Sequence, residues 1–230
     1  MRERWLFVVL ALLAAGCLEA GPCVPGTLAS YEALPPAGCT VGQYSAATFV
    51  FTVLSSSGGA VPLTDMQITV TPSSTTTRQT LNFASSGFSV AVNGSVQYLI
   101  GYTWDPSNPI QSMDDFMDPP SAVLGFAKVT TVGCLGAAWT AGPTCSTSTA
   151  SVNVFDNNGA TQFNNSTSFA PVFILGIRNT IDLQALGGSA SFDSFGNESV
   201  LPEPGTWGCC AAGLALLAAR LRRVGSRLRS

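Results

Sequence analysis

The feature that most constrains the fold is an alternation of apolar and polar residues with a period of two through the middle of the chain. In the longest such run, residues 96–104, every second side chain is a valine, isoleucine, tyrosine or tryptophan. Asn93-Gly94, just before this run, predicts a hairpin turn. Further candidate runs occupy residues 49–53, 66–70, 88–92, 123–132, 151–155, 169–177 and 181–186. Short strands separated by turn residues predict an all-β body, a β-sandwich of the immunoglobulin-like or jelly-roll-like kind.

The aromatic residues of the longest run have two interpretations. Tyr98, Tyr102 and Trp104 share one face of the predicted strand. Packing in the core is the ordinary explanation for such a stripe. The alternative is a flat, exposed surface on which sugar rings stack.

The N-terminus has the pattern of a signal peptide over residues 1–20. Basic residues come first, and the apolar run 5–15 that follows is too short to span a bilayer comfortably. Cleavage after Gly16 and cleavage after Ala20 both fit the small residues that come next. The residues before Cys17 faintly resemble a lipobox, so lipidation there stays an alternative. The segment predicts export from the cytoplasm.

The C-terminus has three parts. Pro202, Glu203 and Pro204 predict an extended hinge, because proline cannot continue a helix or a central strand. The apolar segment Trp207–Ala219 follows, and five arginines within residues 220–229 close the chain. Arginines are costly to move through hydrocarbon, so we expect them to stay cytoplasmic with the apolar segment as a membrane helix. Taken alone, this pattern also fits a simple tail anchor.

In the order of motif, apolar helix and terminal arginines, residues 200–230 resemble the PEP-CTERM sorting signal. The resemblance implies processing by an exosortase-type membrane protease, after a transient anchorage in the inner membrane. The apolar run is shorter than the family's pattern, which leaves a retained anchor open. The chain thus divides into a signal peptide (1–20), an exported β-sandwich domain (21–199) and a sorting tail (200–230).

The body is also similar to a group of uncharacterised PEP-CTERM proteins. This resemblance implies a fold and a destination, and no activity. It rests on short matches spread over most of the body: Gly26-Thr27-Leu28-Ala29-Ser30-Tyr31, Gly38-Cys39-Thr40-Val41-Gly42, the Cys134-Leu135-Gly136…Cys145 loop, Val154-Phe155-Asp156-Asn157 and Phe169-Ala170-Pro171.

Four cysteines belong to the predicted body: Cys23, Cys39, Cys134 and Cys145. An even number in an exported domain predicts two disulfides, for which three connectivities exist. Pairing Cys23 with Cys39 and Cys134 with Cys145 closes two short loops rich in proline and glycine. A four-thiolate zinc site is the rival interpretation, but neither pair has the spacing of a metal knuckle.

The body is acidic, and the chain contains no histidine. Its basic residues are Arg78, Lys128 and Arg178, which give no electrostatic footprint for nucleic acid. Without histidine, the Ser-His-Asp and Cys-His mechanisms are excluded. The sequence also lacks the P-loop, GxSxG, HExxH and dinucleotide-binding motifs. We therefore expect a protein without catalytic residues and without a cofactor.

The densest acidic cluster consists of Asp114, Asp115 and Asp118, just before two prolines. Its ordinary interpretation is a solvated, turn-rich loop. The functional interpretation is a calcium site, since calcium takes several carboxylate and carbonyl oxygens, although the spacing is not that of an EF-hand. A carboxylate pair here is also the basis for the weakest hypothesis, a glycosidase.

Trp139 is the predicted ligand contact. It lies in the loop between Cys134 and Cys145, and a loop tryptophan held by a disulfide is less readily explained as core.

These features predict a non-catalytic, exported protein of the cell surface or of an exopolysaccharide matrix, sorted through its tail. The alternative is a carbohydrate-binding module, with calcium as a candidate ligand. The expected partners are the membrane before processing, an exosortase-type protease and exopolysaccharide, and nucleic acid is not expected.

Overall fold

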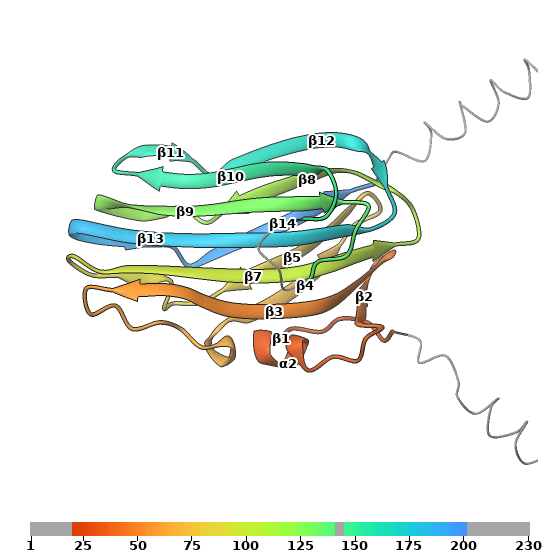
Figure 1. Cartoon of the computed structure of the whole chain (residues 1–230), viewed down its shortest axis with the longest axis horizontal. Coiled ribbons are helices and arrows are strands. Elements are labelled where there is room, and N and C mark those ends of the chain that lie inside the picture. Colours follow the sequence, from red (N-terminus) through yellow and green to blue (C-terminus); the bar gives the residue numbers. More distant parts are fainter. Residues whose placement is uncertain (1–19, 141–144, 202–230) are drawn as a thin grey trace, which may run out of the picture.

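The body is a sandwich of two antiparallel β-sheets (Figure 1), and the computed structural model describes residues 20–140 and 145–201 of it. The large sheet has eight strands: β2 (Cys39–Val41), β3 (Tyr44–Ser57), β6 (Ser89–Val90), β7 (Ser95–Pro106), β9 (Ser121–Leu135), β10 (Thr149–Asn157), β11 (Ala160–Gln162) and β13 (Leu175–Ser191). The small sheet has six strands: β1 (Gly26–Thr27), β4 (Thr69–Ser74), β5 (Arg78–Ala84), β8 (Ile110–Met117), β12 (Asn164–Val172) and β14 (Ser194–Val200). The predicted all-β sandwich is confirmed.

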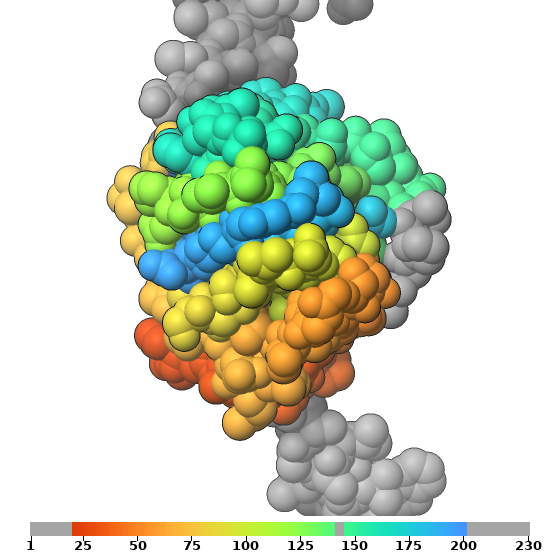
Figure 2. Space-filling model, turned by 90° about the vertical axis from the view of Figure 1, so that its left-hand side faces the viewer, coloured from red at the N-terminus to blue at the C-terminus, as the bar shows by residue number. Residues whose placement is uncertain are grey.

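Strands that are distant in sequence lie side by side in both sheets. The large sheet runs β11-β10-β9-β13-β7-β3-β2 with β6 beside β13, and the small sheet runs β1-β4-β5-β14-β8-β12. In the large sheet Ile181 of β13 pairs with Tyr98 of β7 on one side and with Val129 of β9 on the other. Figure 2 shows this mixing as teal β10, green β9, blue β13, yellow β7 and orange β3 following one another across the molecule.

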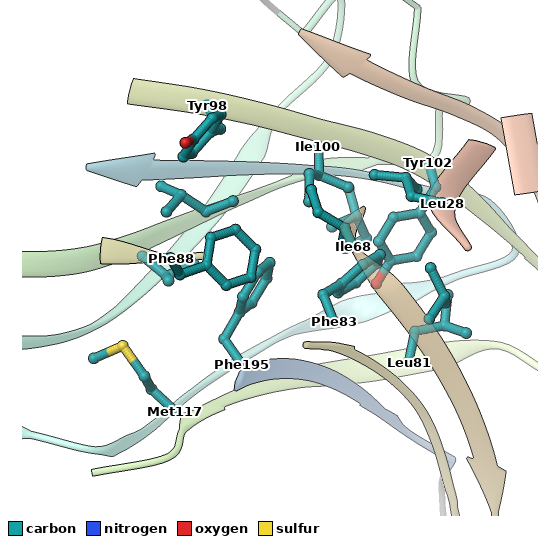
Figure 3. Close-up of a cluster of buried hydrophobic side chains, with 14 of the residues drawn as sticks. Leu28, Ile68, Leu81, Phe83, Phe88, Tyr98, Ile100, Tyr102, Met117 and Phe195 are labelled. Carbon is teal, nitrogen blue, oxygen red and sulfur yellow. The ribbon is translucent and has the colours of Figure 1, made fainter. Parts of the chain in front are cut away.

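The core lies between the sheets, because the period-two alternation turns the apolar side of each strand inward. Tyr98, Ile100 and Tyr102 of β7 are fully buried. They face Phe83 and Phe195 of the small sheet, whose rings stack with centroids 5.1 Å apart (Figure 3). Trp104 is also 0% exposed. The aromatic stripe is therefore core, and its interpretation as a sugar-stacking surface is wrong.

Two predicted local features differ from the structure. The Asn93-Gly94 turn forms, with the Gly94 amide donating to the Ala91 carbonyl over 2.8 Å. The strands that it joins do not pair with each other, because β6 and β7 both pair with β13. At residues 66–70, Met66 belongs to the 3-10 helix η1 (Asp65–Gln67) and is 64% exposed, so the strand begins only at Thr69.

Helical structure among the described residues is confined to short segments. Helix α2 (Leu28–Glu32) is capped by the Thr27 side chain, which accepts from the Ser30 amide, and it buries Leu28 and Tyr31 against the sandwich. None of the helices in the described ranges is long and apolar enough to cross a membrane. The predicted signal segment up to residue 19 and the whole motif Pro202, Glu203 and Pro204 with the apolar segment after it lie outside those ranges.

Both predicted disulfides are present. Cys23 bonds to Cys39 and attaches the N-terminal segment to β2. Cys134, near the end of β9, bonds to Cys145 and closes the loop that follows. Each bridge restricts the unfolded chain and stabilises the fold by roughly 2–4 kcal/mol.

Candidate functional site

Trp139 covers the outer face of the large sheet and does not lie open to a ligand. Its side chain is 4% exposed, and its backbone amide donates to Thr103 Oγ1 over 2.9 Å. The indole lies against Gly101, where a Cβ atom would be 2.1 Å from Trp139 Nε1. The backbone of the same loop lies close to Gly176, where a Cβ atom would be 2.5 Å from Trp139 N. The prediction of a surface contact residue is therefore wrong, because two glycines leave room on the sheet that the ring and its loop fill.

The three predicted calcium ligands do not converge. They were expected in a solvated loop, but Asp114 and Asp115 lie on strand β8, whose pleat turns Asp115 inward and Asp114 outward. Asp118 lies beyond the strand and accepts a hydrogen bond from the Ser194 hydroxyl. Within the described part of the chain no three acidic or cysteine side chains gather closely enough to hold a metal ion. The alternative of a calcium site at these three residues is therefore not supported, because strand geometry separates consecutive carboxylates.

Asp115 belongs to a polar network between the two sheets. Its Oδ1 accepts from Asn197 Nδ2 over 2.9 Å, and Asn197 Oδ1 accepts from the Tyr102 hydroxyl over 3.0 Å. Across the sandwich, Thr131 donates to Asn179 Oδ1 over 2.7 Å and accepts from Asn197 Nδ2. Burial raises the pKa of Asp115 to about 7, although Thr131 and Asn197 partly counter it. This network is enclosed by the core and offers no surface to a ligand.

The outward side of the same strands forms a groove on the small sheet, which we call the Arg78 groove. Its volume is about 510 Å³. Arg78 Nη1 lies 3.3 Å from Asp114 Oδ2 and also pairs with Glu198, so the guanidinium joins two carboxylates on neighbouring strands. Burial raises the pKa of Asp114 and the Arg78 charge opposes this rise. The lining of the groove is completed by Asp115, Phe116, Asn164, Asn165 and Ser166.

Phe116 forms the apolar floor of the Arg78 groove. It lies opposite Gly196 of β14, and a Cβ atom on that glycine would be 2.2 Å from the tip of the Phe116 ring. The tip of the ring therefore lies over the glycine backbone. On its other side Phe116 pairs with Asn164 of the edge strand β12, whose amide is exposed.

A second depression lies on the outer face of the large sheet, across β9 and β10, and we call it the two-ring platform. Its residues are Phe126, Lys128, Asn153, Phe155 and Asn157, and its volume is about 390 Å³. Phe155 pairs directly with Lys128, and Asn157 pairs with Phe126, so the two aromatic rings are diagonal neighbours on one face. Diagonal side chains in an antiparallel pair are about 7–8 Å apart and within reach of aromatic groups.

The platform continues onto β13 and β7 as a row of polar side chains. Lys128 pairs with Asp182, and Asp182 pairs with Gln97, so a cation, a carboxylate and an amide lie in line across three strands. Burial raises the pKa of Asp182, and the Lys128 ammonium and the Gln97 side chain counter part of this rise. The row therefore offers hydrogen-bond donors and acceptors with little net charge beside the two rings.

The sequence contains a feature that indicates the platform and that was not used in predicting the strands: the position of Phe126 and Phe155 in the alternation. The runs 123–132 and 151–155 were predicted as strands, but their two phenylalanines occur in the polar phase of the alternation. Phe126 alternates with Ala127 and Val129, which are fully buried, and Phe155 follows the buried Val154. Two neighbouring aromatic side chains in the outward phase form a contiguous apolar patch, which is the kind of surface that interaction sites use.

Comparisons with known proteins leave this site unassigned. No family model and no curated protein matches the chain. Among solved structures, TmCBM61 in complex with β-1,4-galactotriose overlaps 65% of this chain and 86% of its own at 12% identity and a TM-score of 0.32. The enzymatically active domain of the bacteriophage CBA120 tailspike protein 4 covers 70% of this chain and 20% of its own, at 9% identity and a TM-score of 0.30. A carbohydrate-binding module from the β-sandwich superfamily covers 79% and 62%, at 8% identity and a TM-score of 0.26. TM-scores this low carry no argument about the function of this chain.

Proposed function

We propose that this chain is a non-catalytic, exported protein of the cell surface or exopolysaccharide matrix whose sandwich binds carbohydrate at the two-ring platform. The observation that carries the proposal is the pair Phe126 and Phe155 on the outer, solvent-facing side of the large sheet. Both rings are partly exposed and open onto the same depression.

The chemistry of the platform fits a saccharide. A pyranose ring has an apolar face of C–H groups that packs on an aromatic ring, and a rim of hydroxyls that needs donors and acceptors. Asn153 and Asn157 each offer an amide that donates and accepts, and Lys128 adds a donor. An apolar surface with a few directed polar groups is the usual composition of a site for a small ligand.

The proposal that the protein is non-catalytic is supported by the ion pairs that the acidic side chains make. A glycosidase needs one carboxyl group that gives up a proton and a second that stabilises positive charge on the sugar. Asp114 and Glu198 are neighbours on the small sheet, but Arg78 pairs with both. The guanidinium therefore engages both carboxylates of the pair, so neither is left free to act on a sugar.

Export and sorting complete the proposal. Their support is the sequence of the two ends: the signal-peptide pattern of residues 1–20 and the order of hinge, apolar segment and arginines in residues 200–230. The tail places the body outside the inner membrane, where polysaccharide is available.

An array of neutral, amino-sugar and uronic-acid oligosaccharides tests the carbohydrate proposal. The purified body is expected to bind a subset of the array, and Phe126→Ala and Phe155→Ala are each expected to weaken that binding at least tenfold, about 1.4 kcal/mol. The loss follows from removing the aromatic surface while the inward side of the strand stays unchanged.

Phe173→Ala is the matched control, because Phe173 is 61% exposed and lies between β12 and β13, outside the platform. It is expected to bind like the wild type. An array without signal, or equal losses in all three variants, would refute the carbohydrate proposal.

A further inference from the structure

We propose that the Arg78 groove is a second saccharide-binding site, so that one chain bridges two polysaccharide strands. The inference rests on the proposed function of the platform for its ligand class, and it assigns a separate site on the opposite outer face of the sandwich. The groove lies on strands β5, β14, β8 and β12 of the small sheet, whereas the platform lies on β9 and β10 of the large sheet.

The groove repeats the composition of the platform with different residues. Phe116 supplies the aromatic surface, fixed in orientation because its ring lies on Gly196. Asn164 and Ser166, on the exposed edge strand, supply an amide and a hydroxyl on one side of that ring. Arg78 supplies guanidinium donors on the other side, and its side chain is 51% exposed.

The carboxylates of the groove select the class of sugar. Asp114 and Glu198 are paired with one arginine, so the groove carries two negative charges against one positive charge. Carboxylates accept hydrogen bonds from sugar hydroxyls and attract an ammonium group, and they repel a uronic acid. We therefore assign neutral or amino sugars to the groove. Because both carboxylates already contact Arg78, a cation is not needed to hold them together.

The position of the two sites determines what the protein does with a polymer. A polysaccharide chain that is bound along one outer face of the sandwich cannot reach the other outer face without leaving the first. Two sites on opposite faces therefore engage two polysaccharide strands and hold them together. Bridging of this kind raises the apparent affinity for a polymer above that of either site.

Calorimetric titration with two soluble probes, cellohexaose and chitohexaose, tests the number of sites per chain. The wild type is expected to bind two oligosaccharides per chain. Ser166→Arg fills the groove with a side chain opposite Asp114 and leaves the core untouched, and it is expected to bind one. The double variant Phe126→Ala/Phe155→Ala is also expected to bind one.

Ser168→Arg is the matched control, because Ser168 is exposed on the same strand, opposite Ser112 and outside the groove, and it should keep two sites. A wild type that binds one oligosaccharide, lost only in the platform variant, would overturn the second site and leave the proposed function standing. One oligosaccharide lost only in Ser166→Arg would refute the platform and support the groove. A wild type that binds neither probe while the array gives a signal for uronic acids alone would overturn the assignment of sugar class.

Discussion

Asp115 is the residue whose neighbours in space differ most from its neighbours in sequence. The sequence places it in an acidic run, whereas the structure encloses it between the sheets with Tyr102, Asn197 and Thr131. One of its oxygens, Oδ2, has no hydrogen-bond partner within residues 20–140 and 145–201. A buried carboxylate that lacks one partner is costly to ionise, which explains the rise of its pKa to about 7.

The raised pKa of Asp115 predicts that the free energy of unfolding decreases as the pH rises. An aspartate in the unfolded chain has a pKa of about 3.9, so the folded state binds this proton more tightly. Below pH 4 the carboxyl of Asp115 is protonated in both states and does not lower the free energy of unfolding. That free energy falls as the pH rises from about 4 through the folded pKa of about 7. Asp115→Asn imitates the protonated form and is expected to raise the melting temperature at pH 8 by about 5 °C or more, with little change at pH 4.

Thermal unfolding followed by circular dichroism between pH 4 and 8 measures this difference. Asp193→Asn, at an exposed aspartate, is the control and should follow the wild type throughout. If the melting temperatures of Asp115→Asn and the wild type differ by the same amount at pH 4 and at pH 8, the assignment of a buried, titrating carboxyl is contradicted.

At the scale of elements, the loop between β9 and β10 shows how glycine in a strand makes room for a neighbour. Gly101 of β7 and Gly176 of β13 are buried on the outer side of the large sheet, and the Trp139 loop lies on both. The Cys134–Cys145 bridge closes this loop and limits the freedom of the tryptophan in the unfolded chain.

Gly101→Ala is expected to displace the Trp139 ring and destabilise the fold by roughly 1–3 kcal/mol, because the new methyl group would overlap the indole. Chemical denaturation followed by tryptophan fluorescence measures the effect. Gly21→Ala, at a glycine with no heavy atom within 4 Å of the added Cβ, should unfold like the wild type. If both variants have wild-type midpoints, the ring does not depend on this glycine.

At the scale of the whole molecule, the proposed sorting tail would decide where the sandwich is delivered. In the proposed sorting, the terminal arginines would halt translocation with the apolar segment in the bilayer, since each arginine that crossed would cost a few kcal/mol. In this proposal the motif Pro202, Glu203 and Pro204 would then be accessible to a membrane protease at the outer surface. Processing there would release the acidic body to the envelope or the medium.

Intact-mass analysis of the protein from its native envelope is expected to show the loss of residues beyond about Pro204. A variant with alanine at Pro202, Glu203 and Pro204 should keep the tail and stay in the membrane fraction, because the hinge and the recognised motif are both removed. Wild-type protein recovered only at full length, from a strain with a working exosortase, would favour a simple tail anchor.

The sequence by itself determined the fold class, the presence of four cysteines for two disulfides and the phase of most strands. These follow from local information: an alternation such as Val96 to Trp104 has one apolar side to bury, and Cys23–Cys39 and Cys134–Cys145 close short loops. Only the tertiary structure decided which strands pair. The Asn93-Gly94 turn formed as predicted, yet β6 and β7 pair with β13, which lies far along the chain.

In the candidate sites, too, some features follow from the local sequence and others only from the tertiary structure. The position of Phe126 and Phe155 in the outward phase of their strands was legible in the sequence, but their meeting on one face depends on the register of β9 with β10. From their neighbours in sequence, Trp139 was predicted as a ligand contact, and Asp114 and Asp115 were considered as calcium ligands. The pleat of β8 turned the two aspartates apart, and two glycines on distant strands buried the tryptophan. Side-chain function here depends on which strands become neighbours, and that is settled by long-range packing.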